Sequence, residues 1–497
     1  MDAGHGLPIE HVFVLMLENH SFDNLLGFSG IPGVQHAWPD DANCYDDIWY
    51  SVGAPGAPVT MPTDPGHEIA DVTEQLCGNR FALQPFQPYP TTITKSGFVS
   101  NYATSTSEQN PRLPVSSEYR DVMACFDTPH QLKVLHALAT QFTVCDMWFA
   151  SVPGPTFPNR FFLHGASSNG WADTPSIDVI KNWITSGQKF TYPSGASIFD
   201  RLAQRGNPWR VYYDTDGPAI GSVPWVTVIE GVDYPTDVHP LSELGRDLAG
   251  AYPYAYTFIE PNYGDIASGT FAGGSSQHPC DGMGRGEALI KTTYELVRNS
   301  SIWEQSLLVV LYDEHGGFYD SVAPGRAVQP DDGSAWDPAI NACGFLFDHY
   351  GVRVPAVVVS PWTAAGVDHT VYDHASVPAT IEHLFGLAPL TARDAAANHL
   401  GPLIGERRPR TDCPLTLPDP VPDPAPRADG QGAGLDDEPL PDAHSLYGAL
   451  ASLALADLRV SSSPAEQLGA RRRFASLRTR GDARAYADEV VARLGRR

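Results

Sequence analysis

The chain has 497 residues, of which 42% are hydrophobic and 10% aromatic, and its formal net charge at pH 7 is −26. This composition is typical of a folded globular enzyme and excludes a largely disordered chain. The negative charge argues against nucleic acid as a partner, and it repels strongly anionic membranes while leaving a zwitterionic lipid surface as a candidate.

The first eight residues lack the basic region and the apolar stretch of a signal peptide. We therefore expect either a cytoplasmic protein or the mature form of an exported one, and the compartment stays open. No apolar run approaches the roughly 20 residues that span a bilayer, so we expect no transmembrane anchor. Seven cysteines without any CxxC spacing argue against a zinc ribbon.

Four apolar, β-branched runs each end in polar or acidic residues: 12–17, 254–259, 307–312 and 354–359. Their continuous apolarity predicts strands buried on both faces, as in a parallel sheet covered by helices. Helical patterns occupy 286–298 and 377–384. We therefore predict an α/β fold with a mostly parallel sheet, with functional residues at the carboxyl ends of the strands.

Long stretches rich in Gly, Pro and Ser, at 30–65, 84–117 and 264–284, predict long loops over the active-site face. Residues 1–413 are predicted to form the catalytic domain, 414–441 a Pro-, Asp- and Gly-rich linker, and 442–497 a helical, Arg-rich extension. We expect this extension to pack on the acidic body, and the alternative is an interaction arm.

Adjacent carboxylates, Asp313 and Glu314, directly follow one predicted strand and precede a Gly-Gly pair. Such a pair is costly to bury unless a cation or protons neutralise it. Glu18 and Asn19 follow the first strand in the same way, and their oxygens suit a divalent cation. The alternatives are a solvated acidic turn and a helix start. The apolar strand and the glycines favour a metal site.

Thr156 lies in a proline-rich turn, PGPTFPN, that would hold its hydroxyl rigidly. A metal-bound threonine alkoxide could attack phosphorus, although a helix cap is the commoner role for such a residue. His67, His278 and His374 could protonate a leaving oxygen or stabilise phosphoryl charge. With 17 histidines in the chain, any single one is more often structural.

In order along the chain, these segments resemble the bacterial and plant-type phospholipases C and the related acid phosphatases of the alkaline-phosphatase-like superfamily. The resemblance covers roughly residues 9–400. The matching segments are ENHSFD at 18–23, SVPGPTFPNRFFLHGASSNG at 151–170, IFDRL at 198–202, 209–213, FIEP at 258–261, HP at 278–279, DEHGGFYD at 313–320 and 350–387.

The resemblance implies an alkaline-phosphatase-like α/β sandwich with a bound divalent metal, whose identity stays open among Zn, Ca, Mg, Mn and Fe. The implied metal ligands are Glu18, Asn19, Thr156, Asp313 and Glu314. The residues implied to surround the phosphoryl group are Thr156, His67, His278, His374 and Asn159. The sequence departs from the family pattern at His20, where an Arg is usual, and at Asn24, where a His is common.

The expected reaction is metal-dependent hydrolysis of a phosphoric ester through a phospho-Thr156 intermediate. The favoured substrate is a phosphodiester such as phosphatidylcholine, reached by transient contact with a membrane surface and cleaved as by a phospholipase C. A phosphomonoesterase is the alternative, and it would need an extra cation such as Arg160 or Arg120. A non-catalytic binding protein on the same fold is a third hypothesis.

Overall fold

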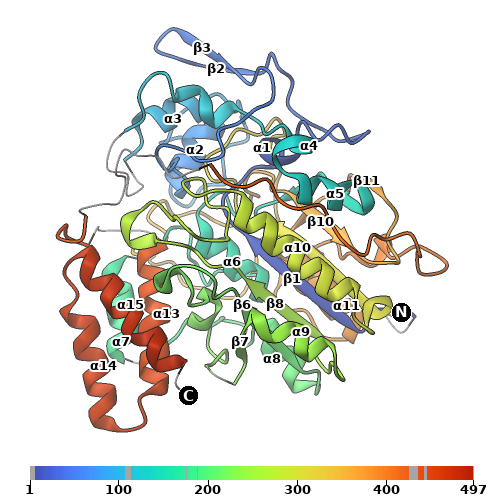
Figure 1. Cartoon of the computed structure of the whole chain (residues 1–497). Helices are drawn as coiled ribbons and strands as arrows, with labels where there is room; N and C mark the ends of the chain where they lie inside the picture. Colours follow the sequence, from blue (N-terminus) through green and yellow to red (C-terminus); the bar gives the residue numbers. More distant parts are fainter. Residues whose placement is uncertain are drawn as a thin grey trace.

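The computed structural model describes residues 6–106, 113–174, 176–186, 188–234, 236–424, 435–440 and 445–495. Its centre is an eight-stranded sheet in the order β11-β4-β10-β9-β1-β8-β6-β7 (Figure 1). The strands in that order are β11 (Gly366–Asp368), β4 (Thr143–Cys145), β10 (Ala356–Val359), β9 (Ser306–Tyr312), β1 (His11–Leu17), β8 (Tyr256–Glu260), β6 (Trp209–Tyr213) and β7 (Val238–Pro240).

Within this sheet only β10 runs antiparallel to its neighbours, β9 and β4. The predicted α/β fold with a mostly parallel sheet is therefore confirmed, and the run at 354–359 supplies the one reversed strand. All residues of β1 and β9 are buried, as their continuous apolarity requires. Leu17 pairs with Tyr312 at the ends of these two strands, so the next residues of each strand leave the sheet at the same level.

Helices cover both faces of the sheet (Figure 1). One layer consists of α5 (Lys133–Gln141), α9 (Leu244–Leu248) and α10 (Gly284–Arg298). The other consists of α6 (Thr156–Gly165), α8 (Ile198–Gln204) and α11 (Ser376–Phe385). The helices predicted at 286–298 and 377–384 are confirmed as α10 and α11. Among the described residues, none of the helices has the combination of length and apolarity that crossing a bilayer demands.

The Gly- and Pro-rich stretches contain more regular structure than the sequence predicted. The stretch 30–65 includes a hairpin of β2 (Ala42–Tyr45) and β3 (Ile48–Ser51), and 84–117 includes α3 (Phe98–Thr104). The hairpin turn places Asp46 and Asp47 at φ of 52° and 59°, a left-handed conformation that Asp tolerates. With α2 (Ile69–Cys77), these elements form a cap with its own apolar cluster (Figure 1), whereas the apolar side chains of α1 (Phe22–Leu26) belong to the main core.

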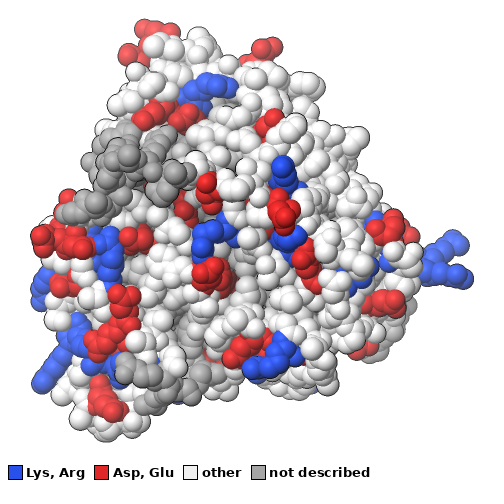
Figure 2. All heavy atoms as spheres, viewed as in Figure 1, with Lys and Arg blue, Asp and Glu red and all other residues white. Residues whose placement is uncertain are grey.

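Three helices form the expected helical extension: α13 (Ser445–Val460), α14 (Pro464–Ser476) and α15 (Arg480–Leu494). α13 packs against η3 (Trp225–Val228) and α7 (Ile177–Ser186). Arg473 and Arg493 both pair with Asp457, which is buried between them, so part of the arginine excess serves internal packing. Figure 2 shows basic and acidic side chains interspersed over these helices.

The segment that was predicted as a linker, 414–441, is only partly described. Its first residues, to 424, lie along α10. The hydroxyl of Tyr294 donates to the carbonyl of Pro414 (2.6 Å), and the backbone N–H of Gly284 donates to Asp423 Oδ1 (2.7 Å). Residues 425–434 and 441 of the predicted linker lie outside the described residues.

Candidate active site

The carboxylate pair and the Glu-Asn pair meet at the carboxyl edge of β1 and β9. Asp313 Oδ1 accepts hydrogen bonds from the backbone N–H groups of Asn19 (3.0 Å) and Glu314 (2.7 Å). Glu18, Asn19, Asp313 and Glu314 are all fully buried. Four of the five side chains that were predicted as metal ligands are therefore brought together, because neighbouring parallel strands end at one edge of the sheet.

Three carboxylate oxygens at this edge accept no hydrogen bond from the described residues: both oxygens of Glu18 and Oε1 of Glu314. Burial raises the pKa of Glu18 from 4.5 to about 7 and that of Glu314 to about 8. Buried oxygens without donors are satisfied by a proton or by a cation. The residues present thus fit the divalent metal ion that the family resemblance implies.

Tight turns bring the loops of the site into contact. Asn19 has a left-handed backbone, with φ of 58°, and Gly316 and Gly317 have φ of 60° and 75°. A Cβ on Gly316 would overlap the carbonyl oxygen of Asn19 and lie 2.9 Å from its Cβ. A Cβ on Gly317 would lie 2.6 Å from Cβ of Pro65. The Gly-Gly pair is therefore needed where three loops meet.

Thr156 is the first residue of α6, and its hydroxyl donates to Oδ1 of Asn19 (3.2 Å). It is 3% exposed. The backbone N–H groups of a first helical turn lack intrahelical partners and carry the positive end of the helix dipole. Thr156 thus combines a hydroxyl, an amide neighbour with metal-ligand chemistry and a local environment that favours an anion.

Asn159 clamps the turn that holds Thr156. Its Nδ2 donates to the carbonyls of Gly154 (2.9 Å) and Pro155 (3.0 Å), and its Oδ1 accepts from the N–H of Val152 (3.1 Å). These bonds engage both ends of the amide. The geometry therefore makes Asn159 a support for the turn that holds Thr156, whereas contact with a phosphoryl group stays a prediction.

The segment before this turn is held by a buried ionic contact. Arg393 Nε donates to Asp373 Oδ2 (3.0 Å), and its Nη2 donates to the carbonyl of Ser151 (2.7 Å). The hydroxyl of Ser151 in turn donates to Asp373 Oδ2 (2.8 Å). Arg393 and Asp373 are both about 1% exposed, so water does not weaken this contact.

Two of the predicted histidines donate hydrogen bonds to backbone carbonyls. His374 Nε2 donates to the carbonyl of Asp313 (2.6 Å), while its Nδ1 accepts from Trp148 Nε1 (3.4 Å). Burial lowers the pKa of His374, so it is a neutral support for the end of β9. His67 Nδ1 donates to the carbonyl of Pro65 (2.8 Å). The His67 ring lies close enough to Glu314 that a positive charge on the ring would lower the pKa of this carboxyl group.

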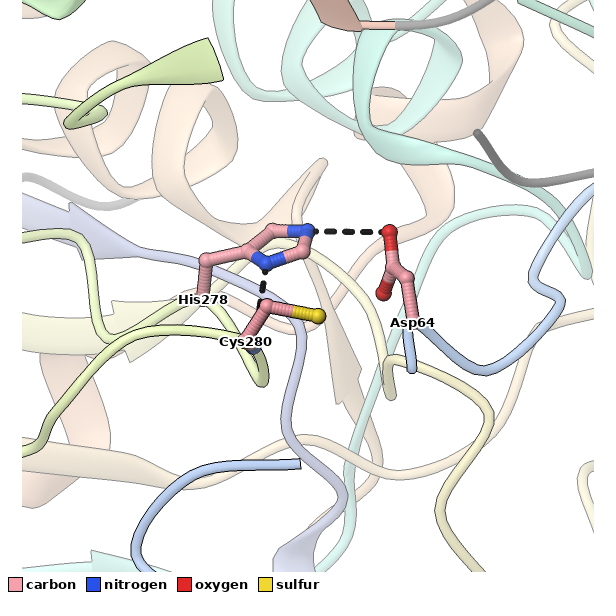
Figure 3. Close-up of side chains that lie close together, drawn as sticks. All are labelled: Asp64, His278 and Cys280. Carbon is pink, nitrogen blue, oxygen red and sulfur yellow. Dashed lines mark hydrogen bonds and ion pairs between the residues drawn. The ribbon is translucent and has the colours of Figure 1, made fainter. Parts of the chain in front are cut away.

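His278 lies in a cluster with Asp64 and Cys280 (Figure 3). Its Nε2 is 3.3 Å from Asp64 Oδ2, and its ring stacks on Phe271 with centroids 3.4 Å apart. Burial favours the neutral imidazole, but the Asp64 carboxylate outweighs burial and raises the pKa of His278. Ligand atoms of the three residues lie within 4.8 Å of one another, a spacing that a metal ion could bridge.

His278 could act as a metal ligand or as a partner of Asp64, and its hydrogen bonds distinguish these two roles. The backbone N–H of Cys280 donates to His278 Nδ1 (3.3 Å). In the neutral ring Nδ1 is therefore the acceptor, and Nε2 carries the proton and faces Asp64. A metal-bound histidine usually donates from its second nitrogen instead. The contacts therefore favour a His278–Asp64 pair over a second metal site.

Arg160 is a site residue whose place the sequence did not predict. Its Nε pairs with Asp313 Oδ2 (2.9 Å), and its Nη2 donates to the carbonyl of Leu17 (3.2 Å). It lies on α6 one turn after Thr156, so the spacing of four residues was the available signal. A buried guanidinium beside the carboxylates offsets part of their charge.

The comparison with protein families matches the profile of the Phosphoesterase family to residues 9–388. The chain belongs to this family. Non-specific phospholipase C3 of Arabidopsis thaliana is 33% identical to it, over 83% of this chain and 76% of the relative. Non-specific phospholipase C6 of the same plant is 32% identical, over 84% and 76%. Non-hemolytic phospholipase C of Pseudomonas aeruginosa is 27% identical, over 77% of this chain and 55% of the relative.

The predicted family is thereby confirmed, and this phosphoesterase is a phosphoric ester hydrolase. Solved structures match more distantly. A phosphonate monoester hydrolase of Agrobacterium radiobacter is 11% identical over 81% of this chain and 79% of that one, with a TM-score of 0.33. A protein in the alkaline phosphatase superfamily from Vibrio parahaemolyticus is 14% identical over 56% and 64%, with a TM-score of 0.30.

Several family-motif residues of the phosphoesterase hold the scaffold together. Arg353 Nε pairs with Asp320 Oδ1 (2.7 Å) and its Nη2 with Asp23 Oδ1 (3.3 Å), so three motif segments meet in one buried ionic cluster. The two departures from the family pattern also lie together, since His20 Nδ1 is 2.7 Å from Asn24 Oδ1. Within the described part of the chain, neither His20 nor Asn24 makes a hydrogen bond to the carboxylates that are predicted as metal ligands.

Proposed function

We propose that this phosphoesterase cleaves phosphodiesters in the manner of a phospholipase C, through a covalent phosphothreonine at Thr156. The observation that carries the proposal is the contact of the Thr156 hydroxyl with Asn19, the neighbour of Glu18, whose buried carboxylate oxygens accept no hydrogen bond from the described residues. The names of the relatives support a phospholipid, with phosphatidylcholine as the first substrate to test.

The residues that would hold the metal ion are Glu18, Asn19, Thr156, Asp313 and Glu314. A divalent cation bound there would lower the pKa of the Thr156 hydroxyl and neutralise phosphoryl charge. All five residues offer oxygen atoms, a donor set that suits Mg, Mn or Ca and is also used by Zn and Fe.

Side chains and backbone N–H groups of the protein carry out the other parts of the reaction. Asn19 orients the Thr156 hydroxyl, which loses its proton to water as its oxygen bonds to phosphorus and the bond to the leaving alcohol breaks. His278, whose pKa is raised by Asp64 against the effect of burial, or His67 supplies the proton to the alcohol. The first-turn N–H groups of α6 stabilise the phosphoryl oxygens. Water then attacks the phosphothreonine and regenerates the Thr156 hydroxyl.

The charge balance favours a diester over a monoester. A monoester brings one more negative charge, which a dedicated cation should meet. Arg160 is already paired with Asp313, and Arg120 donates to backbone carbonyls of the cap at Ser51 and Val52. Arg120 is thus engaged in the cap, and only Nη1 of Arg160, which donates to no described residue, is left for a second phosphate charge.

The test compares hydrolysis of p-nitrophenylphosphorylcholine and p-nitrophenyl phosphate by wild type and by Thr156→Ala. We expect chelator-sensitive cleavage of the choline diester, lost by about 1000-fold or more in the variant because the nucleophile is gone. Thr140→Ala, at an exposed threonine on α5, is the matched control and should keep full activity. Near-wild-type turnover by Thr156→Ala would remove the nucleophile assignment, and cleavage of the monoester alone would make the protein a phosphatase.

A further inference from the structure

The C-terminal extension contacts the helix that begins with the proposed nucleophile. Gly448, on α13, lies against the ring of Phe157, the residue that follows Thr156. A Cβ on Gly448 would overlap Cζ and Cε2 of that ring and lie 3.2 Å from Cε1. Glycine inside a helix is less favourable than alanine, so close packing is the physical reason for this residue here.

Phe157 belongs to an aromatic stack that continues to Arg160. Its ring lies 5.0 Å from that of Trp225 at 19°, and Trp225 lies 3.7 Å from Tyr263 at 6°. The guanidinium of Arg160 lies over both, at 5.6 Å from Trp225 and 5.2 Å from Tyr263. Packing therefore runs without interruption from α13 to the arginine that pairs with Asp313.

This stack has little room to move. The cavity lined by Phe157, Arg160 and Trp225 has a volume of only about 10 Å³, at the lower limit for one water molecule. A side chain added at 448 could not be absorbed by sliding the Phe157 ring inward. The start of α6 would have to shift instead, and Thr156 with it.

Polar contacts hold the extension in place on the body. Arg480 Nη1, on α15, donates to the carbonyl of Ala267 (2.8 Å), and Arg484 Nε pairs with Asp265 Oδ1 (3.1 Å). Arg480 is 8% exposed. These contacts lie beside the aromatic stack, because α13 and α15 pack on the same short helices of the body.

We propose that α13 is a positioning element of the catalytic centre, in which Gly448 sets the place of Phe157 and thereby of Thr156 and Arg160. Gly448 lies beyond residues 9–388, which the family profile matches. The activity readout rests on the proposed function of Thr156, whereas the position of the stack is measured independently of activity.

The experiment compares full-length wild type, Gly448→Ala and Gly469→Ala. Gly469, on α14, has only the flexible end of Arg473 near its Cβ direction, at 3.5 Å, and serves as the matched control. We expect Gly448→Ala to lower kcat for the choline diester at least tenfold with KM little changed, since a displaced nucleophile reacts more slowly without weakening binding. Tryptophan fluorescence should shift in Gly448→Ala alone, because Trp225 lies in the stack.

A second-site variant distinguishes a displaced Thr156 from a general destabilisation of the fold. Adding Phe157→Leu to Gly448→Ala makes room for the new methyl group and should recover most of the lost kcat. Unchanged kcat and fluorescence in Gly448→Ala would overturn the proposal, and so would a loss that the double variant does not relieve. If Thr156→Ala kept its activity, the proposed function would fail, while the fluorescence shift of Gly448→Ala would still decide whether α13 positions the stack.

Discussion

Replacing Glu18 by Gln should stabilise the metal-free protein at alkaline pH while abolishing its response to metal. Burial raises the pKa of Glu18 from 4.5 to about 7. A carboxyl group whose pKa is raised on folding contributes stability below its unfolded pKa, and this contribution is lost as pH rises from about 4.5 to about 7. At 1.36 kcal/mol per pKa unit, ionising Glu18 costs about 3 kcal/mol of unfolding free energy by pH 8.

The assay is urea unfolding in chelator at pH 5 and pH 8, repeated with added divalent cation. The loss of stability between the two pH values should be about 2.5 kcal/mol smaller in Glu18→Gln than in wild type, because part of the effect is already present at pH 5. Added cation should raise the midpoint of wild type but not of the variant. Glu10→Gln, at an exposed glutamate just before β1, should behave like wild type. An unchanged pH dependence in Glu18→Gln would refute this reasoning about the buried carboxylate.

Two further predictions concern the loops around the site. Gly316→Ala should cost about 3 kcal/mol or more and remove activity, because the methyl group meets the backbone of Asn19 in a left-handed conformation. Gly333 has the same left-handed backbone but open space around it, so Gly333→Ala should lower the unfolding free energy in urea by only about 1–2 kcal/mol. An equal loss of unfolding free energy in the two variants would contradict the contact between Gly316 and Asn19. Asp64→Asn should lower the pKa of His278 and move the alkaline limb of phosphatidylcholine hydrolysis to lower pH, and a limb that stays in place would exclude His278 as the acid.

Much of the sheet edge could be predicted because strand burial and the ends of strands are local properties of the sequence. The runs that became β1 and β9 are apolar throughout, and the carboxylates directly follow them. Parallel neighbours then bring Glu18 and Asp313 to one edge. Nothing beyond the hydrophobic pattern and the rule for parallel sheets was needed for this part.

The partners of individual side chains could not be predicted in the same way. Asn159 and His374 lie at positions that the family motif predicts. Their side chains donate to backbone carbonyls, however, and a sequence motif does not identify such hydrogen-bond partners. Arg160 pairs with a carboxylate more than 150 residues away. The contact of Gly448 with Phe157 depends on how an entire extension docks. Such details follow from three-dimensional packing, so sequence spacing alone leaves them open.

The position of β1 in the middle of the sheet has a consequence for synthesis of the chain. Its two partners, β8 and β9, end at Glu260 and Tyr312, so both edges of this apolar strand lack their pairing partners while most of the body is made. At the usual speeds of translation, roughly 300 residues take about 15–60 s. During that interval a nascent chain presents an unpaired hydrophobic strand, the kind of segment that chaperones shield and that aggregates when it is not shielded. We therefore expect the yield of folded enzyme to respond to translation rate and chaperone supply more than to the strength of any single contact at the active site.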